Sequence, residues 1–246
     1  MIKRCALIAL ALAVPANAQP ESDPPAVETT AQASESEFVG RYNGNSFETA
    51  MGMEIRADGQ FAWGLSVGGL DLRAKGTWTQ QGDTIVLTSD PKPVPAEFKL
   101  IGIKPRSEDA LVHVFRTNGK RATYVDALVE CSDGRTTYET VAGGTADYGS
   151  GTCANPVAVA VRQPGYNVSS PRFDLVELGW KKGDSIHIEF HTNDLGVADF
   201  TGMTGLLEGG RLKLFGGQGL LSQPAPRPGE VVFELRKMPP RTEQQP

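Results

Sequence analysis

The side chains with the clearest capacity for chemistry lie close together near position 190. The stretch from Ser185 to His191 alternates polar and apolar residues, so it is expected to form a half-buried β-strand with His187, Glu189 and His191 on one face. Residues two apart on a strand lie about 7 Å from each other, which allows His187 and Glu189 to share a metal ion. The two histidines are about 13 Å apart, so they are not expected to bind the same ion.

A complete metal centre is harder to assemble from this chain. A catalytic zinc ion needs three protein ligands, and His113 is the remaining histidine. A polar, solvent-facing stripe opposite an apolar core stripe explains the same alternation. A metal site at His187, Glu189 and His191 is therefore the minor alternative to an ordinary half-buried strand.

Other catalytic arrangements are not marked by the sequence. No Gly-x-Ser-x-Gly nucleophile elbow occurs, and neither a Ser-His-acid triad nor a pair of glycosidase carboxylates is recognisable from spacing alone. Asn193, Asp194 and Asp199 could supply oxygen ligands to calcium, but their order does not match an EF-hand, and a turn with an Asx hydrogen bond explains them. No cofactor is expected, and a non-enzymatic role is favoured over an enzymatic one.

These side chains must be positioned by β-structure, because the chain reads as strands throughout. Short β-prone runs separated by Gly and Asp turns favour a small antiparallel barrel or sheet, and no window shows capped helical spacing. An Asn-Gly turn at 117–120 predicts a hairpin between a strand at 111–116 and one near Val125. The predicted fold class is all-β. The first runs are 37–42, 51–56, 61–66, 74–80 and 84–88.

Two breaks divide the β-rich part of the chain. Three prolines at 91–95 end strand pairing, and a Gly-Trp-Lys-Lys-Gly segment at 179–183 is a second candidate boundary. The 97–178 stretch between them has the size of a small domain. The flanking parts, 37–95 and 184–237, are expected to pair with each other, because the first part alone would leave open sheet edges. We therefore predict one discontinuous barrel or sheet domain with an inserted β-sandwich; two sequential domains are the alternative.

The N-terminus has the pattern of an export signal. Lys3 and Arg4 precede an apolar stretch, and Ala16-Asn17-Ala18 offers a small-residue cleavage site. The apolar stretch is too short for a transmembrane helix, which needs about 20 residues. Removal of residues 1–18 is expected to leave a periplasmic or secreted protein without a transmembrane segment, and a lipid anchor at Cys5 is the minor alternative.

Charge and composition restrict the partners of the mature chain. Loss of Lys3 and Arg4 changes the formal net charge from −5 to −7. A mildly acidic chain without a Lys/Arg cluster disfavours nucleic acid and anionic membrane surfaces, so a protein or a small molecule is the expected partner. Residues 19–36 and 238–246 hold prolines and few large apolar groups, so they are expected to form a disordered linker and tail.

Two cysteines remain after processing. An even number of cysteines in an exported chain predicts a disulfide between Cys131 and Cys153. A loop closed over 22 positions is worth about 3 kcal/mol in the chain-entropy model. Two unpaired thiols are the alternative.

The first β-rich part resembles lipocalin-like modules of bacterial exported proteins. Phe38-Val39-Gly40-Arg41-Tyr42 is similar to the opening strand of such barrels, with Tyr42 in place of the tryptophan of a Gly-x-Trp motif, and Gly76-Thr77-Trp78 supplies a second such motif. If the barrel is open, Tyr42, Trp63 and Trp78 are expected to line a ligand cavity. Small barrels are usually filled by their own side chains, which is the alternative.

Four segments of the middle part form a turn, a strand, a turn and a closing Gly-Tyr, in that order: 118–120, 125–129, 133–134 and 164–166. This order resembles that of transthyretin-like or carboxypeptidase-regulatory-like β-sandwiches. The resemblance implies a stabilising or recognition domain and no catalysis.

Taken together, these patterns favour an exported, non-enzymatic envelope protein with a binding or structural role and an unknown activity. A carrier that holds a small apolar ligand in the barrel mouth is the first alternative. A metal-dependent hydrolase built on the strand from His187 to His191 is the second.

Overall fold

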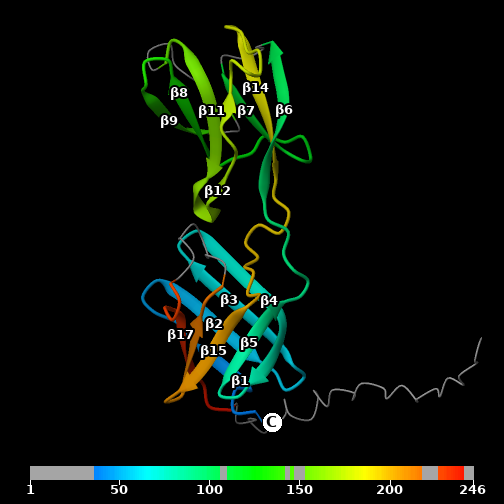
Figure 1. Ribbon diagram of the computed structural model, residues 1–246, viewed down its shortest axis with the longest axis vertical. Helices are drawn as coiled ribbons and strands as arrows, with labels where there is room; N and C mark the ends of the chain where they lie inside the picture. Colours follow the sequence, from blue (N-terminus) through cyan, green and yellow to red (C-terminus); the bar gives the residue numbers. More distant parts are fainter. Residues whose placement is uncertain (1–35, 106–109, 142–144, 147–152, 218–226, 241–246) are drawn as a thin grey trace, which may run out of the picture.

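The computed structural model describes residues 36–105, 110–141, 145–146, 153–217 and 227–240. The predicted signal peptide, all but one residue of the predicted linker, and positions 241–246 of the predicted tail lie outside the described residues. Figure 1 shows a β-barrel below and a second β-domain above it. No helix in the described part of the chain has the length and hydropathy needed to cross a membrane.

The lower domain is a closed eight-stranded antiparallel barrel built from two separate stretches of chain. Its strands follow the order β1-β17-β16-β15-β5-β4-β3-β2 around the barrel. β5 therefore pairs with β15, although the inserted domain separates these two strands in the sequence. This confirms the predicted all-β fold with a discontinuous barrel. The strands are β1 (Gly40–Asn43), β2 (Thr49–Ile55), β3 (Gln60–Val67), β4 (Leu70–Gln81), β5 (Thr84–Ser89), β15 (Met203–Glu208), β16 (Arg211–Phe215) and β17 (Val231–Lys237).

The alternation of side chains along each strand explains why the barrel closes. In β4, Leu72, Ala74, Gly76 and Trp78 are buried while the residues that alternate with them are exposed, as a strand with one wet face requires. Gly59 and Gly82 lie in the tight turns after β2 and β4 with φ of 79° and 60°, a backbone conformation that glycine adopts without strain.

The barrel core joins the two stretches of chain. Phe200, which follows the inserted domain, is fully buried, and its ring centroid lies 4.9 Å from that of Trp63 and 5.8 Å from that of Phe61. Its backbone N–H donates to the Ser89 hydroxyl at 2.8 Å, which fixes the returning chain beside the end of β5. The two parts of the barrel therefore depend on one shared hydrophobic interior.

The upper domain packs two sheets around a second core. One sheet has the order β10-β7-β14-β6, and the other has the order β12-β11-β8-β9 with β13 paired to β11. Val114, Ile186, Val129 and Val161 contribute to the shared core from both sheets, as an inserted β-sandwich predicts. The strands are β6 (Glu97–Pro105), β7 (Val112–Arg116), β8 (Val125–Cys131), β9 (Thr136–Val141), β10 (Thr145–Ala146), β11 (Pro156–Gln163), β12 (Val168–Ser169), β13 (Phe173–Asp174) and β14 (Asp184–His191).

The inserted domain extends further along the chain than the sequence indicated. β14 pairs antiparallel with β6 and parallel with β7, and its apolar residues Ile186 and Ile188 are fully buried in the sandwich. The predicted boundary at 179–183 is therefore a turn inside the insert, and the barrel resumes at β15 instead of at residue 184. The alternation of polar and apolar residues shows that β14 has one buried face. It does not show whether that face packs in the core of the barrel or in the core of the sandwich.

The predicted hairpin around the Asn-Gly turn is also corrected. The turn forms, with the Gly119 N–H donating to the Arg116 carbonyl at 2.8 Å, and it returns the chain as far as an isolated bridge between Phe115 and Arg121. β7 and β8 then belong to opposite sheets. The chain crosses the core at this point because both strands carry apolar faces that must pack against each other.

The predicted disulfide is confirmed. The Cys131 and Cys153 sulfur atoms are 2.05 Å apart. The bridge joins the end of β8 to the chain that leads into β11, and Cys131 itself is buried.

The insert contacts the barrel through its returning linker and through one loop of the sandwich. Val197 forms a parallel bridge with Arg73 of β4, in which the Arg73 N–H donates to the Gly196 carbonyl and the Ala198 N–H donates to the Arg73 carbonyl. Tyr166, from the short 3-10 turn η2 (Pro164–Tyr166), packs against the barrel core. The returning linker and one loop of the sandwich thus rest on the barrel.

Candidate functional site

The aromatic residues predicted for the barrel mouth all point into the barrel core. Tyr42, Trp63 and Trp78 are each less than 5 % exposed. The Tyr42 hydroxyl donates to the Phe38 carbonyl at 2.5 Å, and burial raises the pKa of Tyr42 well above its ordinary value. The Trp78 indole N–H donates to the Arg56 carbonyl at 2.9 Å, which closes the turn between β2 and β3. Tyr42 and Trp78 therefore act as structural residues.

Trp63 differs from the other two aromatic residues. Its ring contacts Phe200 and Phe233, with centroids 4.9 and 5.1 Å away, but its buried indole nitrogen has no hydrogen-bond partner among the residues that the structure describes. Buried tryptophan N–H groups usually have a hydrogen-bond acceptor. A ligand that carries an acceptor could therefore accept a hydrogen bond from the Trp63 indole N–H.

The three histidines lie on one face of the four-stranded sheet. Two of them pack against each other, and the third pairs with Glu189. His187 and His113, opposite each other on β14 and β7, have ring centroids 4.9 Å apart. Further along β14, His191 Nε2 lies 2.6 Å from a Glu189 carboxylate oxygen. No group of three His, Cys, Asp or Glu side chains in the described part of the chain could hold a metal ion. The geometry thus does not gather the predicted ligands His187, Glu189 and His191 around one point.

The environment of His187 opposes its protonation. Burial lowers the pKa of His187 below its ordinary value, and the nearby His113, Lys104 and Arg121 lower it further. His113 is buried, and its Nδ1 lies 3.2 Å from an Arg121 guanidinium nitrogen. Neutral His187 is therefore the form that this packing favours.

The residues considered for calcium serve the joint between the two domains. An Asp194 carboxylate oxygen accepts a hydrogen bond from the Val94 N–H at 2.8 Å, and the Asn193 side chain donates to the Pro95 carbonyl at 2.8 Å. Asp199 accepts from the Thr201 N–H at 2.9 Å, as an Asx turn predicts. The bonds of Asp194 and Asn193 tie the two linkers together beside a cavity of about 710 Å³.

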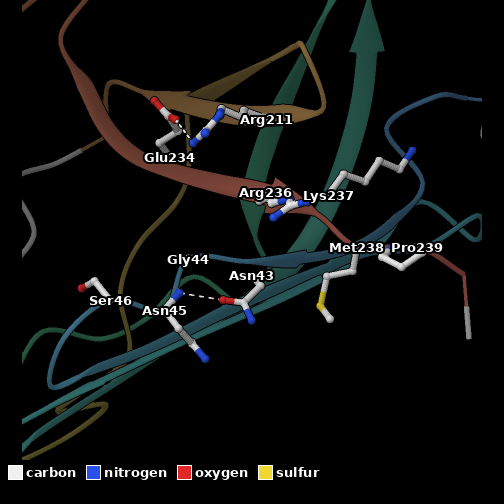
Figure 2. Close-up of a pocket in the computed structure, with 10 residues that line it drawn as sticks. All are labelled: Asn43, Gly44, Asn45, Ser46, Arg211, Glu234, Arg236, Lys237, Met238 and Pro239. Carbon is white, nitrogen blue, oxygen red and sulfur yellow. Dashed lines mark hydrogen bonds and ion pairs between the residues drawn. The ribbon is translucent and has the colours of Figure 1, made fainter.

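A second pocket lies at the seam of the barrel, where β1 and β17 meet (Figure 2). It has a volume of about 780 Å³, within the range of small-molecule sites. We call it the seam pocket. It is lined by Asn43, Gly44, Asn45, Ser46, Arg211, Glu234, Arg236, Lys237, Met238 and Pro239.

Strand register places the charged residues of the seam pocket in a row. Asn43 of β1 is opposite Arg236 of β17, and Arg236 is opposite Arg211 of β16. All three precede or follow buried residues, so their side chains share the outer face of the barrel. Figure 2 shows Arg236 between the hairpin that carries Asn43 and the strand that carries Arg211.

Positive charge exceeds negative charge in this pocket. Arg211 donates to the Glu234 carboxylate at 2.8 Å, and the Lys237 ammonium donates to the Glu37 carbonyl. The Arg236 side chain makes neither a hydrogen bond nor an ion pair within the described residues. Like charges directly opposite each other across two strands destabilise a sheet, so Arg211 and Arg236 together favour a bound anion.

The hairpin between β1 and β2 shapes the opposite wall of the seam pocket. The Asn43 side chain accepts from the Asn45 N–H at 2.7 Å, and the Asn45 side chain accepts from the Met51 N–H at 2.7 Å. A Cβ atom at Gly44 would lie 3.3 Å from Leu235 Cγ, so the hairpin approaches β17 closely there. Both asparagine oxygens are thus engaged, and their NH₂ groups remain available as donors.

The sequence analysis did not single out this pocket. Arg211, Arg236 and Asn43 are ordinary outward-facing strand residues separated by up to 193 positions. The pairing of β16 with β17 brings Arg211 beside Arg236, and the pairing of the first barrel strand with the last brings Asn43 beside Arg236.

No family model, curated protein or solved structure matches this chain. The fold and the side-chain geometry are therefore the basis for a functional argument.

Proposed function

We propose that the chain is an exported, non-enzymatic binding protein that takes an anionic ligand in the seam pocket. The observation that carries this proposal is the directly opposed pair Arg211 and Arg236, of which Arg211 is paired with the Glu234 carboxylate and Arg236 has no ion pair within the described residues. A carboxylate, phosphate or sulfate group between the guanidinium groups would relieve their repulsion and accept charge-assisted hydrogen bonds. The export part of the proposal rests on the N-terminal sequence pattern.

A thermal-shift titration of the mature chain tests this function. Inorganic phosphate, sulfate and acetate are compared with chloride at constant ionic strength. A ligand at about 100 times its Kd stabilises the folded state by about 2.7 kcal/mol, which raises the Tm of a chain of this size by about 5–10 °C.

Two variants locate the effect. R236Q removes the free guanidinium and is expected to abolish the anion-specific shift. R73Q removes an exposed arginine of β4 on the same barrel and outside the pocket, so it is expected to behave as the wild type. Equal shifts in all salts, or equal loss in both variants, would refute the seam pocket as an anion site.

A carrier function for a small apolar ligand is the second candidate, and Trp63 is the observation that favours it. A ligand with a hydrogen-bond acceptor could reach the unpaired indole N–H in the barrel core. Fatty acids would then quench the Trp63 fluorescence in a saturable way, and W63F would lose this response. Trp78 is already bonded to a backbone carbonyl, so W78F would retain it.

A further inference from the structure

A cavity of about 710 Å³ lies at the joint between the barrel and the insert. It is lined by Leu72 of β4, by residues 92–96 of the outgoing linker, by residues 166–169 of the insert and by residues 194–199 of the returning linker. We call it the joint cavity. Figure 1 shows the two linkers side by side between the two domains. The volume is within the range of small-molecule sites, which occur preferentially between domains.

The walls of the joint cavity are fixed by contacts within the protein. The Val94 N–H donates to the Asp194 carboxylate at 2.8 Å, and the Asp194 N–H donates to the Val94 carbonyl at 3.1 Å. The Gly196 carbonyl accepts from the Arg73 N–H of the barrel at 2.9 Å. The Tyr166 ring lies so close to Gly196 that a Cβ atom there would be 3.3 Å from Tyr166 Cε1. A ligand would thus meet a preformed site, which lowers the cost of binding.

Three neutral polar side chains of the joint cavity are not used by the fold. The Tyr166 hydroxyl, the Asn167 carboxamide and the Ser169 hydroxyl make no hydrogen bond within the described residues. Each of these groups can both donate and accept a hydrogen bond. They therefore suit a ligand that carries donors and acceptors together.

The charged side chains of the joint cavity narrow the class of ligand. The Asp194 and Asp199 carboxylates disfavour an anion, and the Lys92 ammonium disfavours a cation. No group of three metal-ligating side chains occurs in the described part of the chain. An apolar ligand would remove water from these charges without replacing its hydrogen bonds. A hydroxyl group, in contrast, donates to a carboxylate and accepts from an ammonium group.

We propose that the joint cavity binds a neutral polyhydroxylated ligand, a saccharide of about the size of a disaccharide. Its hydroxyl groups bond to Lys92, Asp199 and the free polar groups of the insert loop. Val94, which is 56 % exposed, and Leu195 supply apolar surface for the C–H groups of the sugar rings. The site is separate from the seam pocket, so this inference does not depend on the anion site.

Calorimetric titration of the mature chain with maltose, cellobiose and lactose tests this proposal. At least one of these neutral disaccharides is expected to bind in a saturable way, with a Kd of about 1 mM or lower. Calcium chloride and decanoate are the competitor probes. Neither is expected to displace the sugar, because the cavity holds a fixed ammonium group and two carboxylates.

Three variants locate the sugar without removing a contact of the fold. K92Q is expected to weaken binding by about tenfold, and Y166F by about two- to tenfold, since hydrogen bonds to charged groups are the stronger ones. N167G removes the carboxamide and is expected to have the effect of Y166F, because glycine adopts the φ of 48° at this position without strain. K75Q, which removes an exposed lysine of β4 outside the cavity, is the matched control. R236Q is expected to leave the affinity for the sugar unchanged.

Each contrary result overturns the proposal. Equal affinity of the sugar for the wild type, K92Q, Y166F and N167G would show that it binds outside the joint cavity. Displacement by calcium or decanoate would show that the cavity takes a cation or an apolar chain. If none of the three disaccharides binds at concentrations up to about 10 mM, the joint cavity is not a saccharide site. The anion titration of R236Q remains a separate test of the seam pocket.

Discussion

Replacement of Phe200 by alanine tests whether the two stretches of chain share one barrel core. Phe200 is fully buried and contacts the rings of Phe61, Trp63 and Phe233, with centroids between 4.9 and 6.4 Å away. It belongs to the segment that returns from the insert, and its ring and Ala198 bring that segment into the core. Truncation of a buried phenylalanine costs about 3–5 kcal/mol, because it loses apolar burial and leaves a cavity.

Tryptophan fluorescence can follow the barrel alone. Trp63 and Trp78 lie in the barrel core, and Trp180 lies in the insert. In a W180F background, urea unfolding monitored by fluorescence therefore reports the barrel. A loss of about 4 kcal/mol with a slope of about 2 kcal/mol/M lowers the unfolding midpoint by about 2 M urea.

The matched control is F47A. Phe47 is 90 % exposed at the tip of the hairpin between β1 and β2, so its removal is expected to change the free energy of unfolding by less than about 0.5 kcal/mol. If F200A lowers the midpoint no more than F47A does, Phe200 is not part of the barrel core. The shared interior on which the discontinuous barrel depends would then be refuted.

Three further perturbations have expected outcomes. Replacement of both Cys131 and Cys153 by serine is expected to destabilise the insert by about 3 kcal/mol, measured by urea unfolding with and without reductant, since the bridge closes a loop over 22 positions; an unchanged midpoint would contradict this. The pKa of His187 is lowered in the folded protein, so the folded state binds fewer protons than the unfolded state. The free energy of unfolding of the insert is therefore expected to fall as the pH drops below about 6.5. The variant H187Q is expected to flatten this pH dependence. A steeper or unchanged profile in H187Q would show that other groups control it. G76A is expected to lower the free energy of unfolding by about 4 kcal/mol or more, because a Cβ atom there would lie 1.9 Å from a backbone carbonyl oxygen of β5. G64A is the control, because its nearest contact would be at 3.8 Å, and urea unfolding compares the two variants.

Local patterns were sufficient for the first five strands of the barrel and for the disulfide. The alternation of β4 and the glycine turns after β2 and β4 depend on neighbours a few positions away, so they are visible in the sequence. The pairing of Cys131 with Cys153 was predictable because two cysteines lie outside the predicted signal peptide, which leaves one possible intramolecular bridge.

Long-range pairing determined the rest. The alternation of Ser185 to His191 is the same whether the strand joins the barrel or the sandwich, and only its register with β6 and β7 decides between them. Likewise, Arg211 and Arg236 become a like-charge pair because β16 and β17 align them, and Asn43 reaches them because the first strand of the barrel closes against the last. A sequence specifies which face of a strand is apolar, but the neighbours of its polar face are set by the assembly of the sheet, where the seam pocket arises.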